Sequence, residues 1–497
     1  MTALLDNFAL GFHIAFTAAN LFYCFIGVLI GTLIGVLPGI GPAATIAMLL
    51  PLSFGINTTS AIILLAGIFY GAMYGGSTTS ILVNIPGEAA SVMTCVDGYQ
   101  MARQGRAGPA LGIAAFGSFI AGTIGIVILT LVAQPLLKFT LKFGPPEIFS
   151  LMILSLTIVT YLAVGSMLKA LIMAVLGFSL GQIGMDIVTG QIRFSFDILE
   201  LEGGLDLVPM VMGLFGVSEV FVSLHESREV SICQEKIKGL LPNWKDWKDS
   251  IGPILRGTFL GFFVGMLPGG TATVAGFASY AVEKKLSRHP EKFGTGAIEG
   301  VAGPEAANNA AASGCFIPLF SLGIPSNAVT ALLLGSLMMH GVQPGPLLIQ
   351  KNPEIFWGTL MSMYVGNVML LILNLPLIGV WVKLLKIPYR VLFPLILLFC
   401  IIGSYSVNNS RFDVLMVVVF GVIGYLLRRY HYEAAPLVMA FILSPMIENS
   451  LRQSLLMSYG TSLIFFTRPI SLGCLVLAAL VLLSSIFLGK KREALVK

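Results

Sequence analysis

The sequence GTLIGVLPGIGP at 31–42 has a counterpart, GFFVGMLPGGTA, at 261–272. In both copies, which lie 230 positions apart, a run of apolar residues typical of a helix is interrupted by Leu-Pro-Gly. A Pro-Gly interruption in a membrane-spanning helix leaves backbone N–H and C=O groups unpaired, and hydrocarbon cannot satisfy them. Such breaks persist where they face protein or a water-filled cavity. Two matching breaks in corresponding halves therefore predict a substrate site between the halves.

The composition of the chain is that of an integral membrane protein. Hydrophobic residues occupy 56% of its 497 positions and charged residues only 11%, whereas soluble domains carry about 25% charged residues. Apolar stretches near or above the ~20 residues that a bilayer-crossing helix needs recur throughout. They are 107–137, 147–184, 355–382, 391–404, 413–427 and 469–488. We expect an all-α polytopic protein with about 10 to 14 spanning or re-entrant helices, because a β-barrel would show short alternating segments instead.

The distribution of charged residues predicts how the chain is organised in the lipid bilayer. The net charge of +5 bears on membrane topology and does not indicate nucleic-acid binding, because no nucleic-acid motif accompanies it. Lys and Arg favour the cytoplasmic side, so the tail 490–497 is predicted to be cytoplasmic. The longest hydrophilic stretch lies near the middle. We therefore predict a first transmembrane repeat at 1–225, a hydrophilic linker at 226–250 and a second transmembrane repeat at 251–497. The six cysteines show no CxxC or metal-binding spacing.

The two halves match beyond the opening motif, which predicts homologous repeats. NIPGEA at 84–89 matches GIPSNA at 323–328, Phe149 and Gly177 match Phe393 and Gly421, and 209–212 matches 436–439. Basic loops at 103–106 and 284–292 correspond to loops at 337–350 and 52–57 that lack Lys and Arg. Opposite charge at equivalent places favours inverted repeats. The lysines near 138–142 and 383–386 do not follow this pattern.

The Pro-Gly breaks are candidates for binding an anionic substrate. Glycines permit unwound backbone, and the helix that follows each break begins with free N–H groups and a partial positive charge. The alternative is tight helix packing, which we favour for the upstream glycines Gly27, Gly31 and Gly35. The predicted substrate-binding residues at the breaks are Gly39, Gly41, Gly269, Gly270, Thr271 and Thr273.

A second pair of segments, 77–89 and 316–328, places polar residues beside Ile-Pro in otherwise apolar sequence. Hydroxyls of this kind also bond back to their own helix carbonyls, which is the structural alternative. We predict that Ser77, Thr78 and Thr79 in the first segment contact the substrate. Ser326 and Asn327 are the corresponding candidates in the second.

The stretch GPEAANNAAASG at 303–314 has no polar equivalent in the first half. A Glu at membrane depth is costly and is by default a functional candidate. The alternative for Glu305 is a position at the lipid headgroups, beside the basic loop at 284–292. We predict that Glu305, Asn308 and Asn309, with Asn84 of the first half, bind a coupling ion, Na⁺ or H⁺.

No catalytic motif stands out: there is no HExxH or Walker A sequence. We therefore expect a protein that is not an enzyme, holds no cofactor beyond a coupling ion, and takes its energy from an ion gradient or partner proteins. Two alternatives remain, a passive anion channel and an intramembrane enzyme. A channel usually carries a ring of charges or a carbonyl filter through oligomeric symmetry, whereas this symmetry is internal.

The chain resembles the large membrane subunit of the tripartite tricarboxylate transporters over essentially its whole length. The resemblance rests on GVLPGIGP at 35–42, GMLPGG at 265–270, IPGEA at 85–89 and GPEAANNA at 303–310. It implies uptake of organic carboxylates across the bacterial inner membrane, driven by a cation gradient. It also implies two partners, a small membrane subunit with four helices and a periplasmic solute-binding protein.

Overall fold

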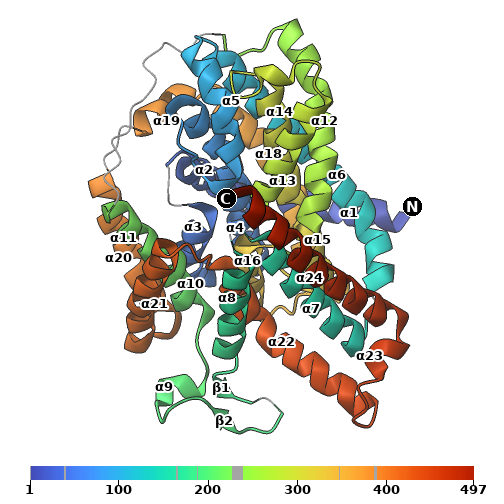
Figure 1. Ribbon diagram of the computed structural model, residues 1–497. Helices are drawn as coiled ribbons and strands as arrows, with labels where there is room; N and C mark the ends of the chain where they lie inside the picture. Colours follow the sequence, from blue (N-terminus) through green and yellow to red (C-terminus); the bar gives the residue numbers. More distant parts are fainter. Residues whose placement is uncertain are drawn as a thin grey trace.

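The computed structural model describes residues 2–37, 41–140, 142–163, 166–186, 188–225, 239–345, 347–385 and 389–496. The fold is helical, as the composition predicts (Figure 1). The helices before the central gap are α1 (Thr2–Ala15), α2 (Ala18–Val36), α3 (Gly41–Leu49), η1 (Pro51–Gly55), α4 (Thr58–Val83), η2 (Ala89–Ser91), α5 (Val92–Arg103), α6 (Ala107–Thr140), α7 (Pro145–Leu162), α8 (Met167–Leu180), α9 (Leu199–Glu202), α10 (Leu207–Val211), the π-helix η3 (Met212–Val217) and α11 (Ser218–His225).

The helices after the gap complete the bundle. They are α12 (Trp244–Met266), α13 (Ala272–Leu286), η4 (Pro290–Lys292), α14 (Glu299–Gly314), α15 (Phe316–Leu322), α16 (Ala328–Met339), α17 (Leu348–Lys351), α18 (Pro353–Asn374), α19 (Ile378–Leu384), α20 (Tyr389–Asn408), α21 (Arg411–Arg429), α22 (Ala435–Met457), α23 (Ile464–Thr467) and α24 (Pro469–Val496). Two short strands, β1 (Gly184–Met185) and β2 (Ile192–Arg193), form an antiparallel hairpin at one end of the molecule.

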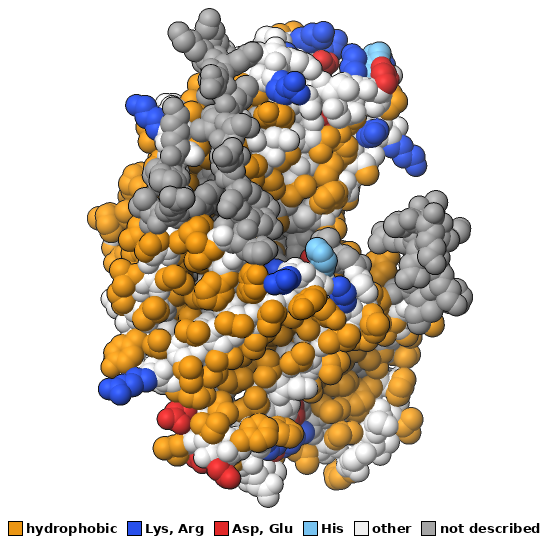
Figure 2. Space-filling model, turned by 60° about the vertical axis from the view of Figure 1, so that its left-hand side comes forward, with side chains coloured by type: hydrophobic (Ala, Val, Ile, Leu, Met, Phe, Trp, Pro, Cys, Tyr) orange, Lys and Arg blue, Asp and Glu red, His pale blue; other side chains and the backbone are white. Residues whose placement is uncertain are grey.

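Five helical segments in the described part of the chain are long and apolar enough to cross a membrane: α2, α4, 107–133 within α6, α7 and α18. Shorter apolar helices accompany them, among them α8 and α16. Figure 2 shows a broad hydrophobic area on one face, with charged side chains gathered mainly toward its upper and lower ends. Exposed large side chains such as Phe259 and Phe263 are what a lipid-facing surface requires.

Several predicted boundaries shift in the structure. The apolar stretch 147–184 forms two helices, because α7 ends at Leu162 and α8 begins at Met167. The predicted linker 226–250 ends inside a helix, since α12 already begins at Trp244. Asn243 caps that helix by accepting a 2.9 Å hydrogen bond from the Asp246 N–H, so charged residues of the linker form the first turns of α12. Residues 226–238 lie outside the described residues.

Glycines join α2 to α4, the completely buried central helix. A Cβ atom added at Gly27, Gly31 or Gly35 would lie 2.4, 2.5 or 2.3 Å from a carbonyl oxygen of α4. Real carbon atoms do not approach oxygen so closely, so only glycine permits this contact. The structure agrees with the packing interpretation of these three glycines. The carbonyls that they face belong to Leu64, Ile68 and Ala72.

The pair α12 and α14 repeats this contact. A Cβ atom at Gly257, Gly261 or Gly265 of α12 would lie 2.3, 2.1 or 2.2 Å from a carbonyl oxygen of α14. The facing carbonyls belong to Gly303, Ala307 and Ala311. Each lies 239 positions after its counterpart in α4. The same glycine spacing thus builds the same helix pair in each half of the chain.

Candidate functional site

The first Pro-Gly segment follows the C-terminal end of α2. Helix α2 ends at Val36 and α3 begins at Gly41, which has a φ of +66° and open space around it. Gly39 lies outside the described residues. The Thr79 hydroxyl of α4 donates a 2.5 Å hydrogen bond to the Val36 carbonyl. It thereby satisfies one of the carbonyls that a helix end leaves without an intrahelical partner.

The loop after α4 packs against the same helix end. A Cβ atom at Gly87 would lie 2.0 Å from the Gly35 carbonyl oxygen, so a side chain at this position would separate the loop from α2. Thr78, also predicted to contact substrate, is buried on α4. The segments 31–37 and 77–88, predicted separately from sequence, are therefore in direct contact.

The second Pro-Gly segment connects α12 to α13. The Gly269 N–H donates a 2.8 Å hydrogen bond to the Ser326 carbonyl, and Gly269 has a left-handed φ of +79°. Gly270 is equally restricted, because a Cβ atom there would lie 1.7 Å from the Val264 carbonyl oxygen. The chain leaves α12 through backbone positions that only glycine occupies without strain. The predicted residues on both sides of this contact therefore meet.

Polar side chains near this contact have different roles. Thr271 caps α13 by accepting a 3.2 Å bond from the Val274 N–H, and Thr273 lies half-buried in the first turn. Asn327 caps α16 by accepting a 2.9 Å bond from the Thr330 N–H. The fully buried Ser326 hydroxyl has no hydrogen-bond partner in the structure.

Two buried carboxylates lie close to the first Pro-Gly segment. Glu305 of α14 accepts a 2.6 Å hydrogen bond from the Ser77 hydroxyl and a second bond from the Thr94 hydroxyl. Glu88 accepts bonds of 2.7 Å from the Ala90 N–H and 3.3 Å from the Asn308 side-chain amide. The two carboxylates are close enough to interact electrostatically. We call Ser77, Glu88, Thr94, Glu305 and Asn308 the acidic cluster.

The acidic cluster has no cationic side chain. Every bond to its carboxylates comes from a hydroxyl, an amide or a backbone N–H, and no ion pair in the described part of the chain includes Glu88 or Glu305. Glu305 is completely buried within the protein, so its carboxylate is not exposed to lipid headgroups at the surface. Burying two charges without a counter-charge costs several kcal/mol for each ion.

Two of the predicted coupling-ion residues lie apart from the acidic cluster. Asn84 is exposed and ends α4 with a left-handed φ of 59°, a conformation that Asn tolerates better than most residues. The Asn309 amide donates to the Ser118 hydroxyl at 2.7 Å, on the side of α14 that packs on α6. Only Glu305 and Asn308 of the four predicted residues meet in the acidic cluster.

The other members of the acidic cluster were not selected from sequence as ion ligands. Glu88 is an acid in an apolar stretch, a weaker case than Glu305, and the structure shows that it also caps a short helix. Thr94 is an isolated hydroxyl in α5. Ser77, which the sequence predicts to contact substrate, donates a hydrogen bond to Glu305. Their common environment arises only when α14 packs against α4 and α5.

A second buried acid has a structural role. Asp97 of α5 accepts backbone N–H bonds of 2.8 to 2.9 Å from Gly294, Gly296 and Ala297, and a 2.9 Å bond from the Tyr280 hydroxyl. These donors satisfy the carboxylate completely and fix the loop that leads into α14. Among the described residues, no group of three or more His, Cys, Asp and Glu side chains gathers as a metal site.

A pocket of about 670 Å³ opens near the strand hairpin, between α8, α16, α21 and α22. Asp186 and Glu448 at its edge pair with Arg193 and Arg452. The hydrogen bond from the Arg452 guanidinium holds the pKa of Asp186 well below its usual range. This ion-pair network ties the hairpin to α22 and includes none of the predicted site residues.

Comparisons with known proteins identify relatives over most of the chain. A family model described as the tripartite tricarboxylate transporter TctA family matches residues 21–439. An uncharacterized 52.8 kDa protein of the TAR-I ttuC' 3' region of Agrobacterium vitis is 51% identical over 487 residues, which cover 97% of each chain. An uncharacterized protein of the TAR-II ttuC' 3' region of the same organism is 52% identical over 227 residues, covering 44% of this chain and 94% of the relative. No solved structure matches.

Proposed function

The chain belongs to the tripartite tricarboxylate transporter TctA family, and from this we propose that it is the large membrane subunit of a secondary transporter that imports organic carboxylates. The family match over 21–439 carries the proposal. The family consists of transporter subunits and not of enzymes, so the intramembrane-enzyme alternative is excluded. Tricarboxylate-like and dicarboxylate-like anions are the proposed substrates.

The second Pro-Gly segment supports an anion site. Helix α13 begins directly after it, and the N-terminus of a helix carries partial positive charge that suits a carboxylate. The Ser326 hydroxyl is unpaired, and the backbone carbonyl of the same residue accepts the hydrogen bond from the Gly269 N–H. A hydroxyl donor beside a helix N-terminus matches the chemistry of a carboxylate. We propose that the substrate lies between the two Pro-Gly segments, with Ser326 as one donor.

Internal symmetry supports alternating access by inverted repeats. Asn84 and Gly323, 239 positions apart, both end their helices in the left-handed conformation. Glu88 and Asn327, also 239 positions apart, both cap the next helix. Basic loops of one half match loops that lack Lys and Arg in the other half, which favours inversion of the repeats.

The proposal includes the remaining parts of a tripartite system. The partners are a small four-helix membrane subunit and a periplasmic solute-binding protein, and the location is the bacterial inner membrane. A gradient of Na⁺ or H⁺ supplies the energy, with the ion bound beside the substrate. We propose that one half or a subdomain moves against the rest to expose the site on alternate sides.

Binding-protein-dependent uptake in proteoliposomes tests this function and the role of Ser326. A panel of carboxylates is offered under separate Na⁺ and proton gradients. Accumulation against a gradient, lost when the cation gradient collapses, is the expected result. The Ser326→Ala variant should raise the KM for the carboxylate about tenfold, because one hydrogen bond to a charged group is worth about 1.5 kcal/mol or more.

Ser336→Ala is the matched control, because Ser336 on α16 is also a fully buried hydroxyl without a partner and belongs to neither Pro-Gly segment. Its uptake should equal that of the unaltered protein. Carboxylate movement that only equilibrates, whatever the cation gradient, would establish the passive channel instead. Equal KM values for the carboxylate in both serine variants would show that Ser326 does not bind the substrate.

A further inference from the structure

The fold does not require polar residues at the acidic cluster. The matched positions in the other half of the chain lie in a similar backbone arrangement and are mostly apolar. The positions 239 residues away from Ser77, Glu88, Thr94, Glu305 and Asn308 are Phe316, Asn327, Leu333, Ala66 and Phe69. Four of these five are apolar and fully or almost fully buried. The Phe69 and Phe316 rings pack with centroids 6.2 Å apart.

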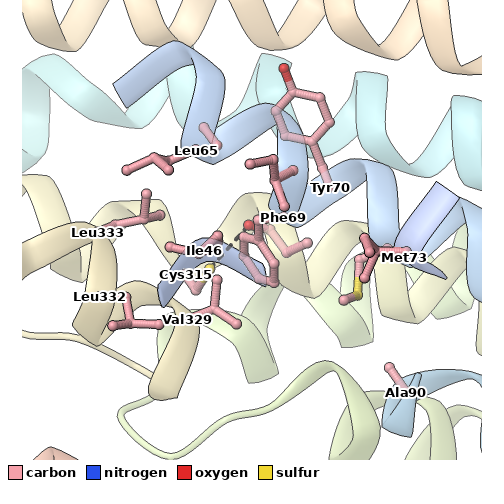
Figure 3. Close-up of a cluster of buried hydrophobic side chains, with 14 of the residues drawn as sticks. Ile46, Leu65, Phe69, Tyr70, Met73, Ala90, Cys315, Val329, Leu332 and Leu333 are labelled. Atoms are coloured by element: carbon pink, nitrogen blue, oxygen red, sulfur yellow. Dashed lines mark hydrogen bonds between the residues drawn. The ribbon is translucent and has the colours of Figure 1, made fainter. Parts of the chain in front are cut away.

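Figure 3 shows Phe69, Leu333 and their neighbours as part of a continuous hydrophobic cluster. The backbone frame around both places is alike, since Glu88 and Asn327 are both N-cap residues in extended conformation and Ser91 and Thr330 complete the two capping boxes. A buried polar group is costly when an apolar one would fit. The acidic cluster therefore has a role other than folding.

The acidic cluster supplies no counter-charge for its two carboxylates. Hydroxyl, amide and backbone donors reach the carboxylates of Glu88 and Glu305, but none of these donors carries a charge. In a medium of low dielectric, two carboxylates that interact with each other repel strongly. A bound cation removes this repulsion.

The oxygen atoms of the acidic cluster define which kind of cation fits. The side-chain oxygen of Asn308 is buried and has no hydrogen-bond partner, although the nitrogen of the same amide donates to Glu88. The amide that carries this free oxygen therefore reaches the acidic cluster. Carboxylate, amide and hydroxyl oxygens without nitrogen or sulfur are the ligands of hard cations. A bound metal ion would give the unpaired amide oxygen of Asn308 a partner.

We propose that Glu88, Glu305 and Asn308 bind one Na⁺ ion, with the hydroxyls of Ser77 and Thr94 completing its shell. This assignment rests on the proposed transport function, for which it names the coupling-ion site. The ligands come from α4, η2 and α5 of the first half and α14 of the second. Occupancy of the site thus joins the two halves.

The location of the acidic cluster explains how Na⁺ would affect the substrate site. Ser77 lies half a turn from Thr79, which bonds the Val36 carbonyl at the end of α2. Glu88 follows Gly87, which packs on Gly35. Glu305 lies on α14, whose Ala311 contacts Gly265 just before the second Pro-Gly segment. A cation that draws these ligands together fixes the positions of both Pro-Gly segments.

Thermal unfolding of the purified, detergent-solubilised protein tests the site without substrate. Na⁺, K⁺ and N-methylglucamine are compared at one pH and ionic strength. Na⁺ should raise the Tm of the unaltered protein by a few degrees, as a ligand that binds only the folded state does. Glu305→Gln and Glu88→Gln should abolish this shift. Without Na⁺ they should be at least as stable as the unaltered protein, because each removes one of the two repelling charges.

Matched variants separate the site from general effects of substitution. Thr94→Val should weaken the Na⁺-dependent shift in Tm. Thr258→Val, which removes an equally buried hydroxyl bonded only to its own helix, should leave the shift unchanged. Direct binding of ²²Na⁺ should fall at least tenfold in Glu305→Gln.

The proposal is overturned if Na⁺ does not stabilise the unaltered protein, if pH or Ca²⁺ alone produces the shift, or if both glutamine variants retain it. Failure of the transport function has a different signature: Na⁺ binds and the variants behave as expected, yet no carboxylate accumulates in proteoliposomes. Conversely, Na⁺-driven uptake that survives in Glu305→Gln and Glu88→Gln would support the transporter and reject this site.

Discussion

At the scale of the residue, the backbone conformation of Asn84 decides its role. Asn84 ends α4 with a φ of 59° and is exposed, and its counterpart Gly323 does the same with a φ of 69°. A left-handed conformation costs most residues about 1 to 2 kcal/mol, and Asn and Gly much less. The backbone of Asn84 thus ends a helix, and the role of its amide as an ion ligand stays a prediction.

Substitution of Asn84 distinguishes these two roles. Asn84→Gly should retain both stability and Na⁺-dependent uptake, because Gly tolerates the left-handed conformation. Asn84→Ala should lower stability by about 1 kcal/mol with the KM for Na⁺ unchanged. Thermal unfolding and the Na⁺ dependence of uptake measure the two effects. A higher KM for Na⁺ in both variants would restore Asn84 as an ion ligand.

The residues of the acidic cluster differ in how far their sequence context reveals them. Glu305 and Asn308 were predictable, because an acid and an amide stand out where the matched segment of the other half is apolar. Glu88 carries a weaker form of the same signal, and Thr94 carries none, because it resembles an ordinary helix residue. Their proximity to Glu305 depends on contacts between positions more than 200 residues apart.

At the scale of the element, two glycine-lined helix pairs position both Pro-Gly segments. Each pair brings a helix that ends at a break, α2 or α12, into backbone contact with a buried partner, α4 or α14. Van der Waals packing drives helix association in lipid, and small residues permit the close approach. The glycine spacing in the sequence predicted such packing, whereas the identity of the partner helices required the structure.

Gly261→Ala tests the second pair. Its Cβ atom would lie 2.1 Å from the Ala307 carbonyl oxygen, so α12 and α14 must separate, at a cost of about 3 kcal/mol. Gly379→Ala is the control, because a Cβ atom at this exposed position of α19 meets no atom within 4 Å and Ala favours a helix. Thermal unfolding should show a large loss of stability for Gly261→Ala only. Equal Tm values would mean that the close contact is not needed.

At the scale of the whole molecule, inverted repeats predict opposite exposure for matched loops. Lys292 lies in the basic loop after α13, and the matched region of the first half contains Gly55, which has open space around it. Single cysteines at these positions should react with a membrane-impermeant maleimide from opposite sides of the membrane. The unsubstituted chain gives the background from native cysteines. Labelling of both positions from the same side would contradict inversion.

The membrane-protein class of this chain and the interruptions after α2 and α12 follow from local features of the sequence. Hydropathy, glycine spacing and Pro-Gly breaks are local properties, and each acts on the chain within a few residues. The same reasoning identified matched segments in the two halves, and the family match agrees with the carboxylate-transporter resemblance.

Only the tertiary structure decided which polar side chains share one environment. Ser77, Glu88 and Thr94 meet Glu305 and Asn308 because α14 packs against α4, η2 and α5, while Asn84 and Asn309 are directed elsewhere. Burial and the absence of a counter-charge are properties of that packing and not of spacing along the chain. The physical reason is that ligands for a buried ion are brought together by non-local contacts, which leave no periodic pattern in the sequence.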